Sequence, residues 1–235
     1  MVGQNADAAN AIMTATLLQA AANMKPATSP DDPGLMAWVF DGVPGDGLFA
    51  GRLAAFGASL NHPVTRVTER NVNEEMARLA DILRSRSDGK RSGRARILLL
   101  GLEPNRLASL RPAEDDFSFS MDDDASPSPE KCLADLLREG PTVGIHSLFW
   151  FDSLNNLNRG LSRVAQREFE SRILFQMSAN DSGQLIDSTA ASDLGLHRGL
   201  LYVEDTGTLE KFRPWALPDP QWLEQAAATI KGLWG

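Results

Sequence analysis

Leu35-Met36-Ala37-Trp38-Val39-Phe40 is an unbroken apolar run that ends at Asp41-Gly42, where a turn follows. A short continuous run of this kind predicts a β-strand that is buried on both faces, as in a parallel sheet. Similar runs occupy residues 96–100, 144–151, 172–177 and 199–203. We expect the runs at 35–40, 96–100, 144–151 and 172–177 to form the centre of the sheet.

Segments with helical periodicity separate these runs. They begin near Gln4, Leu48, Asn71, Ser128, Leu154, Asp181 and Asp219. We expect one helix to carry Leu154, Leu157, Leu161 and Val164. Asp181 and Gln184 are expected to form a capping box, and the last helix to carry Trp222, Ala226 and Ile230 on one face. Alternating strands and helices predict an α/β fold with a mostly parallel central sheet and helices on both faces. In such folds ligands bind at the carboxyl ends of the strands.

Composition limits the classes of function. The chain has 235 residues, 43% of them hydrophobic, which suits one domain over residues 1–235. A net charge of −8 excludes a globally basic nucleic-acid coat. Cys132 has no partner for a disulfide, and His62, His146 and His197 lack metal-ligand spacing. With no signal-peptide pattern or long apolar run, we expect a cytoplasmic protein without a metal site.

The turn after Val2 is the first candidate site. A phosphate-binding loop reads G-x-x-x-x-G-K-[ST], in which backbone N–H groups and the Lys hold phosphate and the hydroxyl holds Mg²⁺. Here Gly3 is in place, but Ala8, Ala9 and Asn10 stand where Gly, Lys and Ser/Thr are needed. A plain strand-to-helix turn is the alternative interpretation. The candidate nucleotide-binding residues of this degenerate loop are Gly3, Gln4, Asn5, Ala8, Ala9 and Asn10.

Glu103 is the candidate catalytic residue. It follows the run Ile97 to Leu100, where a hydrolytic nucleotide site carries an Asp for Mg²⁺ and often a Glu that polarises water. The simpler interpretation, which we favour from the sequence, is an acid on the surface.

Two basic segments are candidate contact surfaces. The first, residues 84–96, includes Arg91 and carries positive charge without interleaved aromatic residues. The second contains Arg159, Arg163 and Arg167, whose spacing predicts one positive edge of a helix. Either is a solvated surface or a contact for an acidic neighbour or a nucleic-acid backbone. Residues 111–129 form an acidic segment that predicts a solvated loop.

From Gly140 onward the order of motifs resembles the carboxyl half of the FtsK/SpoIIIE motor domain, a RecA-like P-loop ATPase of the HerA–FtsK superfamily. Gly144-Ile145-His146 looks like the G-I-H strand of that family, and Arg172 to Ser178 looks like its R-I-x-F-x-V-S strand. Asp181-Ser182 and Leu185-Ile186-Asp187 follow, and Gly199 to Tyr202 is similar to the closing G-x-x-L-Y strand. The resemblance implies a RecA-like P-loop fold for most of the chain.

The departures from that family bear on function. Ala9 replaces the phosphate-loop Lys, Asn10 the hydroxyl residue and Leu102 the Mg²⁺-binding Asp, while Gly183 stands where the motors usually carry Arg. Phosphoryl transfer depends on positioned cations, so we expect no useful hydrolysis and no cofactor beyond weak binding of ATP and Mg²⁺. Restoring Gly, Lys and Thr at positions 8, 9 and 10 is expected to regain binding without hydrolysis.

Three interpretations stay open. The first is a silent, regulatory or assembly module of an FtsK-like motor, similar to degenerate domains of EccC secretion ATPases and forming the C-terminal part of a longer multidomain protein. Its partners would be other domains or subunits of the motor. The second is a DNA translocase domain that neighbouring subunits complete, with DNA as a partner. The third is a binding module for a peptide or another protein.

Overall fold

The computed structural model describes residues 1–88, 94–112 and 128–234. A parallel four-stranded sheet has the order β2-β1-β3-β4, and an antiparallel three-stranded sheet has the order β5-β6-β7. The strands are β1 (Leu35–Asp41), β2 (Val64–Val67), β3 (Arg96–Leu102), β4 (Ile145–Trp150), β5 (Ser171–Leu174), β6 (Gly199–Val203) and β7 (Thr208–Phe212). The mostly parallel α/β architecture is therefore confirmed.

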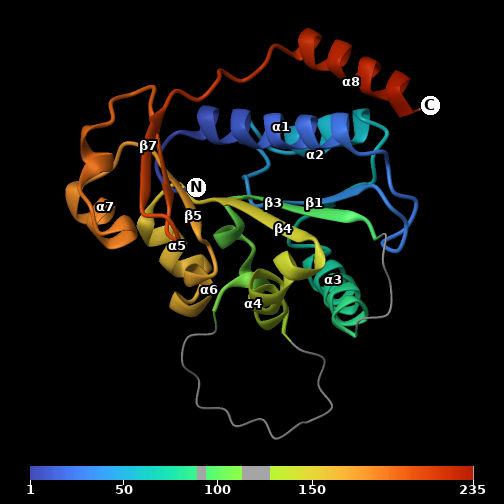
Figure 1. The fold of residues 1–235 in the computed structure, drawn as a ribbon, viewed down its shortest axis with the longest axis horizontal. Coiled ribbons are helices and arrows are strands. Elements are labelled where there is room, and N and C mark those ends of the chain that lie inside the picture. The colour runs from blue at the N-terminus through green and yellow to red at the C-terminus, as the bar shows by residue number, and fades with distance from the viewer. Residues whose placement is uncertain (89–93, 113–127, 235) are drawn as a thin grey trace, which may run out of the picture.

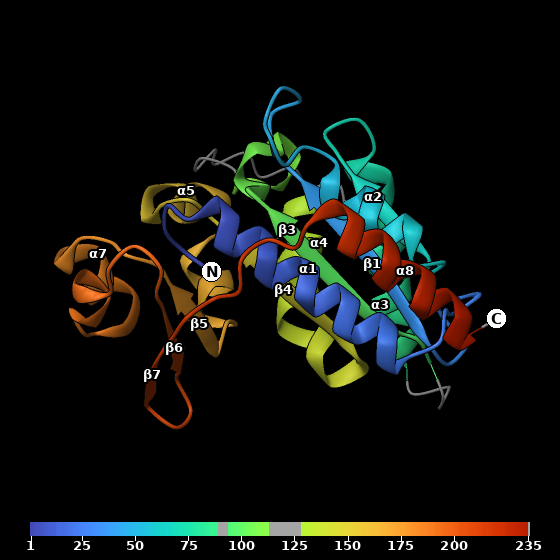
Figure 2. The ribbon, with the colours of Figure 1, turned by 90° about the horizontal axis from the view of Figure 1, so that it is seen from above.

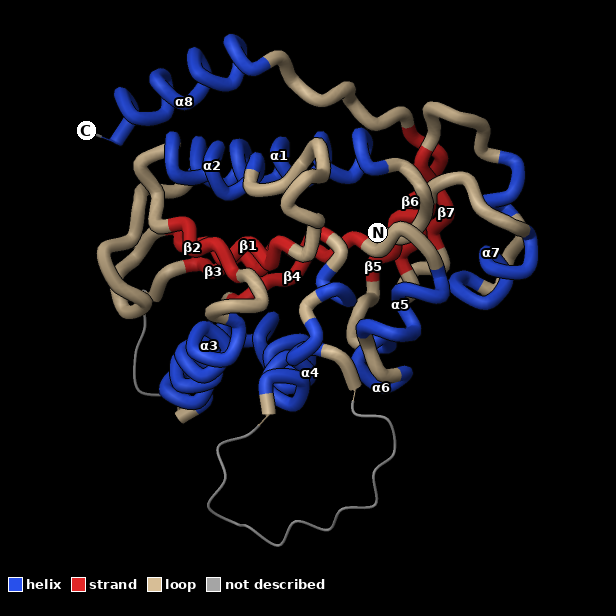
Figure 3. The backbone as a smooth tube through the Cα atoms, turned by 180° about the vertical axis from the view of Figure 1, so that it is seen from behind, coloured by secondary structure: helices blue, strands red, loops and turns tan. Residues whose placement is uncertain are grey.

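Helices cover both faces of the parallel sheet (Figure 1). On one face lie α1 (Ala6–Asn23) and α2 (Arg52–Ser59), and on the other lie α3 (Val72–Ser87) and α4 (Pro129–Glu139). Seen from behind, the sheet is the middle layer between these pairs (Figure 3). Every residue of β1 is buried, and β1 pairs with β3 along its whole length. The two apolar runs thus form the centre of the core, as their composition predicts.

The last helix, α8 (Pro220–Trp234), lies alongside α1 and also contacts α2, as an outer layer (Figure 2). Ala227 and Ile230 are its buried residues, and the Trp234 indole N–H donates to the Ala21 carbonyl at 2.8 Å. The predicted face of Trp222, Ala226 and Ile230 is confirmed at Ile230, which is buried, and is wrong at Trp222, which is 49% exposed.

The run at 172–177 does not lie inside the parallel sheet, so its predicted central place there is wrong. It forms β5, which pairs with β6 in antiparallel fashion. Val2 joins the two sheets, because it makes parallel bridges to Phe151 on one side and Leu174 on the other. Beyond this junction the chain continues through α7 (Ala179–Ile186) to β6 and then turns into β7. The sequence patterns predicted β6 but not β7.

Two local expectations are corrected. The predicted helix from Leu154 is two helices, α5 (Leu154–Gly160) and α6 (Arg163–Arg167), because Ser162 caps a new start and accepts from the Ala165 amide at 3.2 Å. Ser178, not Asp181, caps α7, since its hydroxyl accepts from the Asp181 amide at 3.1 Å. Most of the acidic segment 111–129 lies outside the described residues.

Arg86 is a buried side chain near the end of α3. Its guanidinium donates to the backbone carbonyls of Val143, Pro30 and Ala95 at 3.0, 2.9 and 2.9 Å. Burial lowers the pKa of this guanidinium from its ordinary value. For Arg86 the interpretation of residues 84–96 as a solvated loop is therefore wrong: the side chain ties together three segments that are far apart in sequence.

We expect Arg86→Ala to lower the free energy of unfolding by about 2–4 kcal/mol, because buried carbonyls lose their donor. Arg84→Ala is the matched control, since Arg84 makes only an exposed pair with Asp81 and should leave stability nearly unchanged. Urea unfolding of both variants measures the difference. Equal losses of unfolding free energy in the two variants would show that the buried hydrogen bonds of Arg86 do not stabilise the fold.

Candidate functional site

The turn that leads into α1 is tightly closed. Gly3 has a φ of +120°, and a Cβ there would lie 2.9 Å from the Cβ of Phe175, so only glycine fits without a shift. The Trp150 indole N–H donates to the Gly3 carbonyl at 3.0 Å, and the Asn5 amide donates to the same carbonyl at 2.9 Å. The Gly3 carbonyl therefore points into the protein.

Helix α1 begins only three residues after Gly3. Asn5 is its N-cap, and its side-chain oxygen accepts from the Ala8 amide at 3.1 Å. A phosphate-binding loop keeps four residues between its two glycines, so that successive N–H groups can surround the phosphate. Here the first helical turn occupies that stretch, and Asn5 already takes one of the donors. The turn is thus closed by its own residues.

Ala8, Ala9 and Asn10 face the interior. Their exposed fractions are 6%, 0% and 3%, and the side-chain Nδ2 of Asn10 donates to the Ala6 carbonyl at 2.8 Å. Ala8 and Ala9 belong to the same apolar cluster as Leu102 and Trp150. A Lys at position 9 would start inside this cluster and not beside a phosphate. The geometry argues against the expectation that Gly, Lys and Thr at positions 8 to 10 restore nucleotide binding.

Glu103 lies at the carboxyl end of β3 and is buried, so the favoured interpretation as a surface acid is wrong. It has a φ of +47°, its amide donates to the Trp150 carbonyl at 3.0 Å, and its carboxylate pairs with the Arg106 guanidinium at 2.6 Å. Trp150 thus contacts Gly3 through its indole and Glu103 through its backbone. The turn at Gly3 and the end of β3 at Glu103 therefore both contact Trp150. The carboxylate of Glu103, however, is paired with Arg106.

Asp41, at the end of β1, is a buried carboxylate that the sequence interpretation treated only as part of a turn. One oxygen accepts from the Gly51 amide at 2.7 Å and pairs with Arg66 at 2.8 Å, and the other accepts from the Val43 amide at 3.2 Å. An Asp directly after a buried strand is the signal that could have drawn attention to it. Its contacts fix the loop between β1 and α2, so its role in this structure is structural.

A cavity of about 650 Å³ adjoins the closed turn. Gln4, Asn5, Asp7 and Ala8 form one wall, while Leu196, His197 and residues 213–217 form the other. Trp215 and Leu196 are 79% and 82% exposed, so the second wall offers apolar surface to a partner. Glu103 does not line this cavity, and among the described residues no group of His, Cys, Asp or Glu could hold a metal ion.

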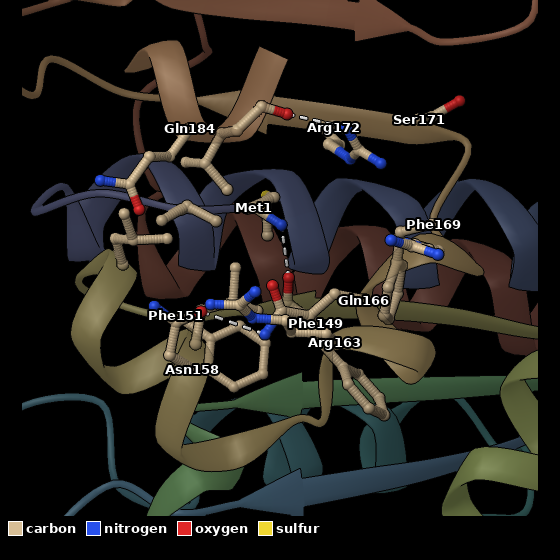
Figure 4. Close-up of a pocket in the computed structure, with 15 residues that line it drawn as sticks. Met1, Phe149, Phe151, Asn158, Arg163, Gln166, Phe169, Ser171, Arg172 and Gln184 are labelled. Atoms are coloured by element: carbon tan, nitrogen blue, oxygen red, sulfur yellow. Dashed lines mark hydrogen bonds between the residues drawn. The ribbon is translucent and has the colours of Figure 1, made fainter. Parts of the chain in front are cut away.

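The arginines predicted as one helical edge lie on two helices. Arg159 is on α5, while Arg163 and Arg167 are on α6, so the predicted continuous edge is wrong. Arg163 and Arg167 line a second cavity of about 450 Å³ beside Met1 (Figure 4). Arg172 reaches the same cavity, and its lining contains no acidic residue. Arg91 lies outside the described residues.

No family model matches this sequence, and no curated protein matches it either. Solved structures do match. EssC (ATPases 2 and 3) from Geobacillus thermodenitrificans superimposes with a TM-score of 0.62 at 13% identity, covering 99% of this chain and 43% of that chain. The chain has the fold of an FtsK-like P-loop ATPase. It spans less than half the length of the EssC structure.

This FtsK-like fold also matches B204, described as the DNA-packaging ATPase from Sulfolobus Turreted Icosahedral Virus, with a TM-score of 0.59 at 10% identity. That match covers 91% of this chain and 95% of B204. B204 from Sulfolobus turreted icosahedral virus 2 in complex with ATP-gammaS matches with a TM-score of 0.56 at 12% identity, again over 91% of this chain and 95% of that one. No helix among the described residues has the length and apolar character needed to cross a bilayer.

We expect Ala9→Lys to lower the free energy of unfolding by about 3 kcal/mol or more, because it buries an unpaired charge in an apolar cluster. Asp7→Lys is the control: this first-turn side chain is exposed, and the variant should fold normally. Denaturant unfolding measures both. The triple variant Ala8→Gly, Ala9→Lys, Asn10→Thr should likewise be unstable and fail to bind ATP in calorimetry; a stable triple variant that binds ATP would contradict this account of the turn.

Proposed function

We propose that this chain is a catalytically silent module of an FtsK-like motor, which acts by contact with other domains or subunits and not by hydrolysing ATP. The observation that carries the proposal is the closed turn between Gly3 and Asn10. The Asn5 cap, the early start of α1 and the burial of Ala9 leave no loop for a triphosphate. Leu102 stands in the core where a Mg²⁺ ligand would be needed, which supports the same conclusion.

The scaffold is retained while the chemistry is lost. The chain superimposes on the matched ATPase structures, so the proposed module would keep the shape of the fold without an active site. We also propose that the chain is the C-terminal part of a longer multidomain protein in the cytoplasm; the match to 43% of the EssC structure supports only the multidomain part of this proposal. In such a protein the shape would serve regulation, assembly or recognition of a partner.

A second candidate function is binding of a peptide or protein in the cavity beside the closed turn. The exposed side chains of Trp215 and Leu196 on its outer wall favour this candidate, because exposed large apolar groups mark interaction sites. A DNA translocase completed by neighbouring subunits receives less support, since Glu103 is held by Arg106 and lies outside that cavity.

We expect the chain to bind ATP with Mg²⁺ weakly or not at all and to release no phosphate from it. The reason is the absence of a Lys and a Mg²⁺ ligand, together with a turn already closed by Asn5. Calorimetric titration and a phosphate-release assay on the same preparation test this. Micromolar binding of ATP with steady release of phosphate would overturn the proposed function. Binding without phosphate release would contradict the closed turn and support only the loss of catalysis.

We expect the double reversal Arg163→Glu, Arg167→Glu to weaken association with the other domains of the parent protein or with duplex DNA, most strongly at low salt. The reason is that these cations line a cavity without acidic residues. Arg159→Glu, on the neighbouring helix, is the matched control and should have a smaller effect. Association that neither variant changes at any salt concentration would make all three arginines solvated surface.

A further inference from the structure

His62 is a buried histidine at which the ends of two helices meet. Only 5% of the residue is exposed. Its Nε2 lies 2.8 Å from the Met24 carbonyl oxygen, and its Nδ1 lies 3.0 Å from the Leu60 carbonyl oxygen. Met24 is the C-cap of α1 and Leu60 is the C-cap of α2. One ring therefore contacts the carboxyl ends of both helices on this face of the sheet (Figure 1).

The residues on either side of His62 hold the ring in this place. Asn61 has a φ of +61°, the left-handed conformation that commonly ends a helix, and it ends α2 after Leu60. Pro63 disfavours helical backbone at His62, so the helix cannot continue. The Pro63 carbonyl accepts from the Ala37 amide at 2.9 Å, which attaches this segment to β1.

Both partners of the His62 ring are hydrogen-bond acceptors. A carbonyl oxygen cannot donate, so each of the two contacts needs an N–H on the ring. A neutral imidazole carries one N–H and leaves its other nitrogen facing a carbonyl oxygen, with lone pairs on both atoms. The imidazolium carries an N–H on both nitrogens and satisfies both carbonyls. The geometry therefore fits the charged ring better than the neutral one.

The position at two helix ends also favours a positive charge on the ring. The carboxyl end of a helix carries partial negative charge, and a charged histidine there is stabilising. Neither α1 nor α2 has a basic residue in its last turn. Burial acts in the opposite direction, because it disfavours a charged histidine. Two charge-assisted hydrogen bonds are available to offset that cost.

Lys25 is the other charged group that lines the cavity of about 650 Å³ beside His62, among the described residues. Its positive charge opposes a second one on the ring. Hydrogen bonds from Thr28 and Ser29 lower the pKa of Asp32, which lies outside the cavity and stays ionised near neutral pH. The other charged residues of the adjoining elements do not line the cavity either: Asp7, Asp31, Asp41, Arg52, Arg66, Glu224 and Lys231.

The end of α1 that contacts His62 also holds the last helix. The Trp234 indole N–H donates to the Ala21 carbonyl at 2.8 Å, within the last turn of α1, and Trp234 lines the same cavity as His62. Helix α8 contacts both α1 and α2 (Figure 2). The position of the α1 end relative to α2 therefore determines where the last turn of α8 docks.

We propose that His62 is a pH-dependent tie between the ends of α1 and α2. The doubly protonated ring binds both C-cap carbonyls and holds α1, α2 and the last turn of α8 together. When the ring loses one proton to solvent, one nitrogen faces a carbonyl oxygen without an N–H, so one of the two contacts opens. The end of α1 is then no longer tied to α2, and the Trp234 contact with that end loosens.

Nitrogen NMR of the full chain from about pH 5 to 9 measures the protonation of the ring directly. We expect His62 to carry an N–H on both ring nitrogens at a pH where the exposed His197 is already neutral. As His62 loses its proton, hydrogen exchange of the Trp234 indole N–H, corrected for the intrinsic effect of pH, should become about tenfold faster. A His62 ring that is neutral throughout this range would overturn the proposal.

His62→Gln supplies a side chain that is neutral at every pH. We expect the folding equilibrium constant of the wild type, divided by that of this variant, to fall about tenfold as the pH rises across the same range, because the charged ring is lost. Burial lowers the pKa of His146 and of the Met1 amino group, so these groups change stability in the opposite direction. They are present in both proteins and cancel in the ratio.

His197→Gln is the matched control, since His197 is exposed, and it should keep the pH dependence of the wild type. Equal pH dependence of stability in the wild type and His62→Gln would overturn the proposal, as would exchange at Trp234 that does not respond to the His62 proton. If His62→Gln does not fold, the NMR titration of the wild type decides alone. Neither measurement involves nucleotide, so its outcome is independent of the proposed function.

Discussion

The double pairing of Val2 is the interaction on which the rest of the structure depends. Its bridges to Phe151 and Leu174 join the parallel sheet to the antiparallel one, and they fix the point at which α1 starts. Because Gly3 follows directly and its carbonyl accepts from the Trp150 indole N–H, the turn before the helix is held against β4. The two-sheet architecture and the closed turn therefore have the same origin.

The proposed function rests on the closed turn, which would let a P-loop ATPase fold exist without nucleotide chemistry. In an active site of this class the first helical N–H groups are kept for phosphate. Here Asn5 uses one of them, and Ala9 packs against the core where a cation would be required. Under the proposed function, capping by Asn5 and packing of Ala9 would stabilise the fold at the expense of a phosphate site.

Sequence patterns predicted the parts of the fold that depend on local chemistry. The apolar runs at 35–40 and 96–100 became β1 and β3, and Ser128-Pro129 marked the start of α4 correctly. The position of β5 depends on a single bridging residue, Val2, which carries no pattern. The break at Ser162 and the cap at Ser178 were missed because each helix offered more than one suitable capping residue. The burial of Glu103 and Arg86 depends on partners distant in sequence.

The central claim is that the residues from Gly3 to Asn10 form a closed helix start and not a nucleotide loop. An amide NMR titration with ATP and Mg²⁺ up to millimolar concentration observes these residues one by one. The account predicts that the amides of Gln4 to Asn10 keep their chemical shifts and that the Ala8 amide stays protected throughout. A saturable shift concentrated in this turn, with the Ala8 amide released from Asn5, would contradict it.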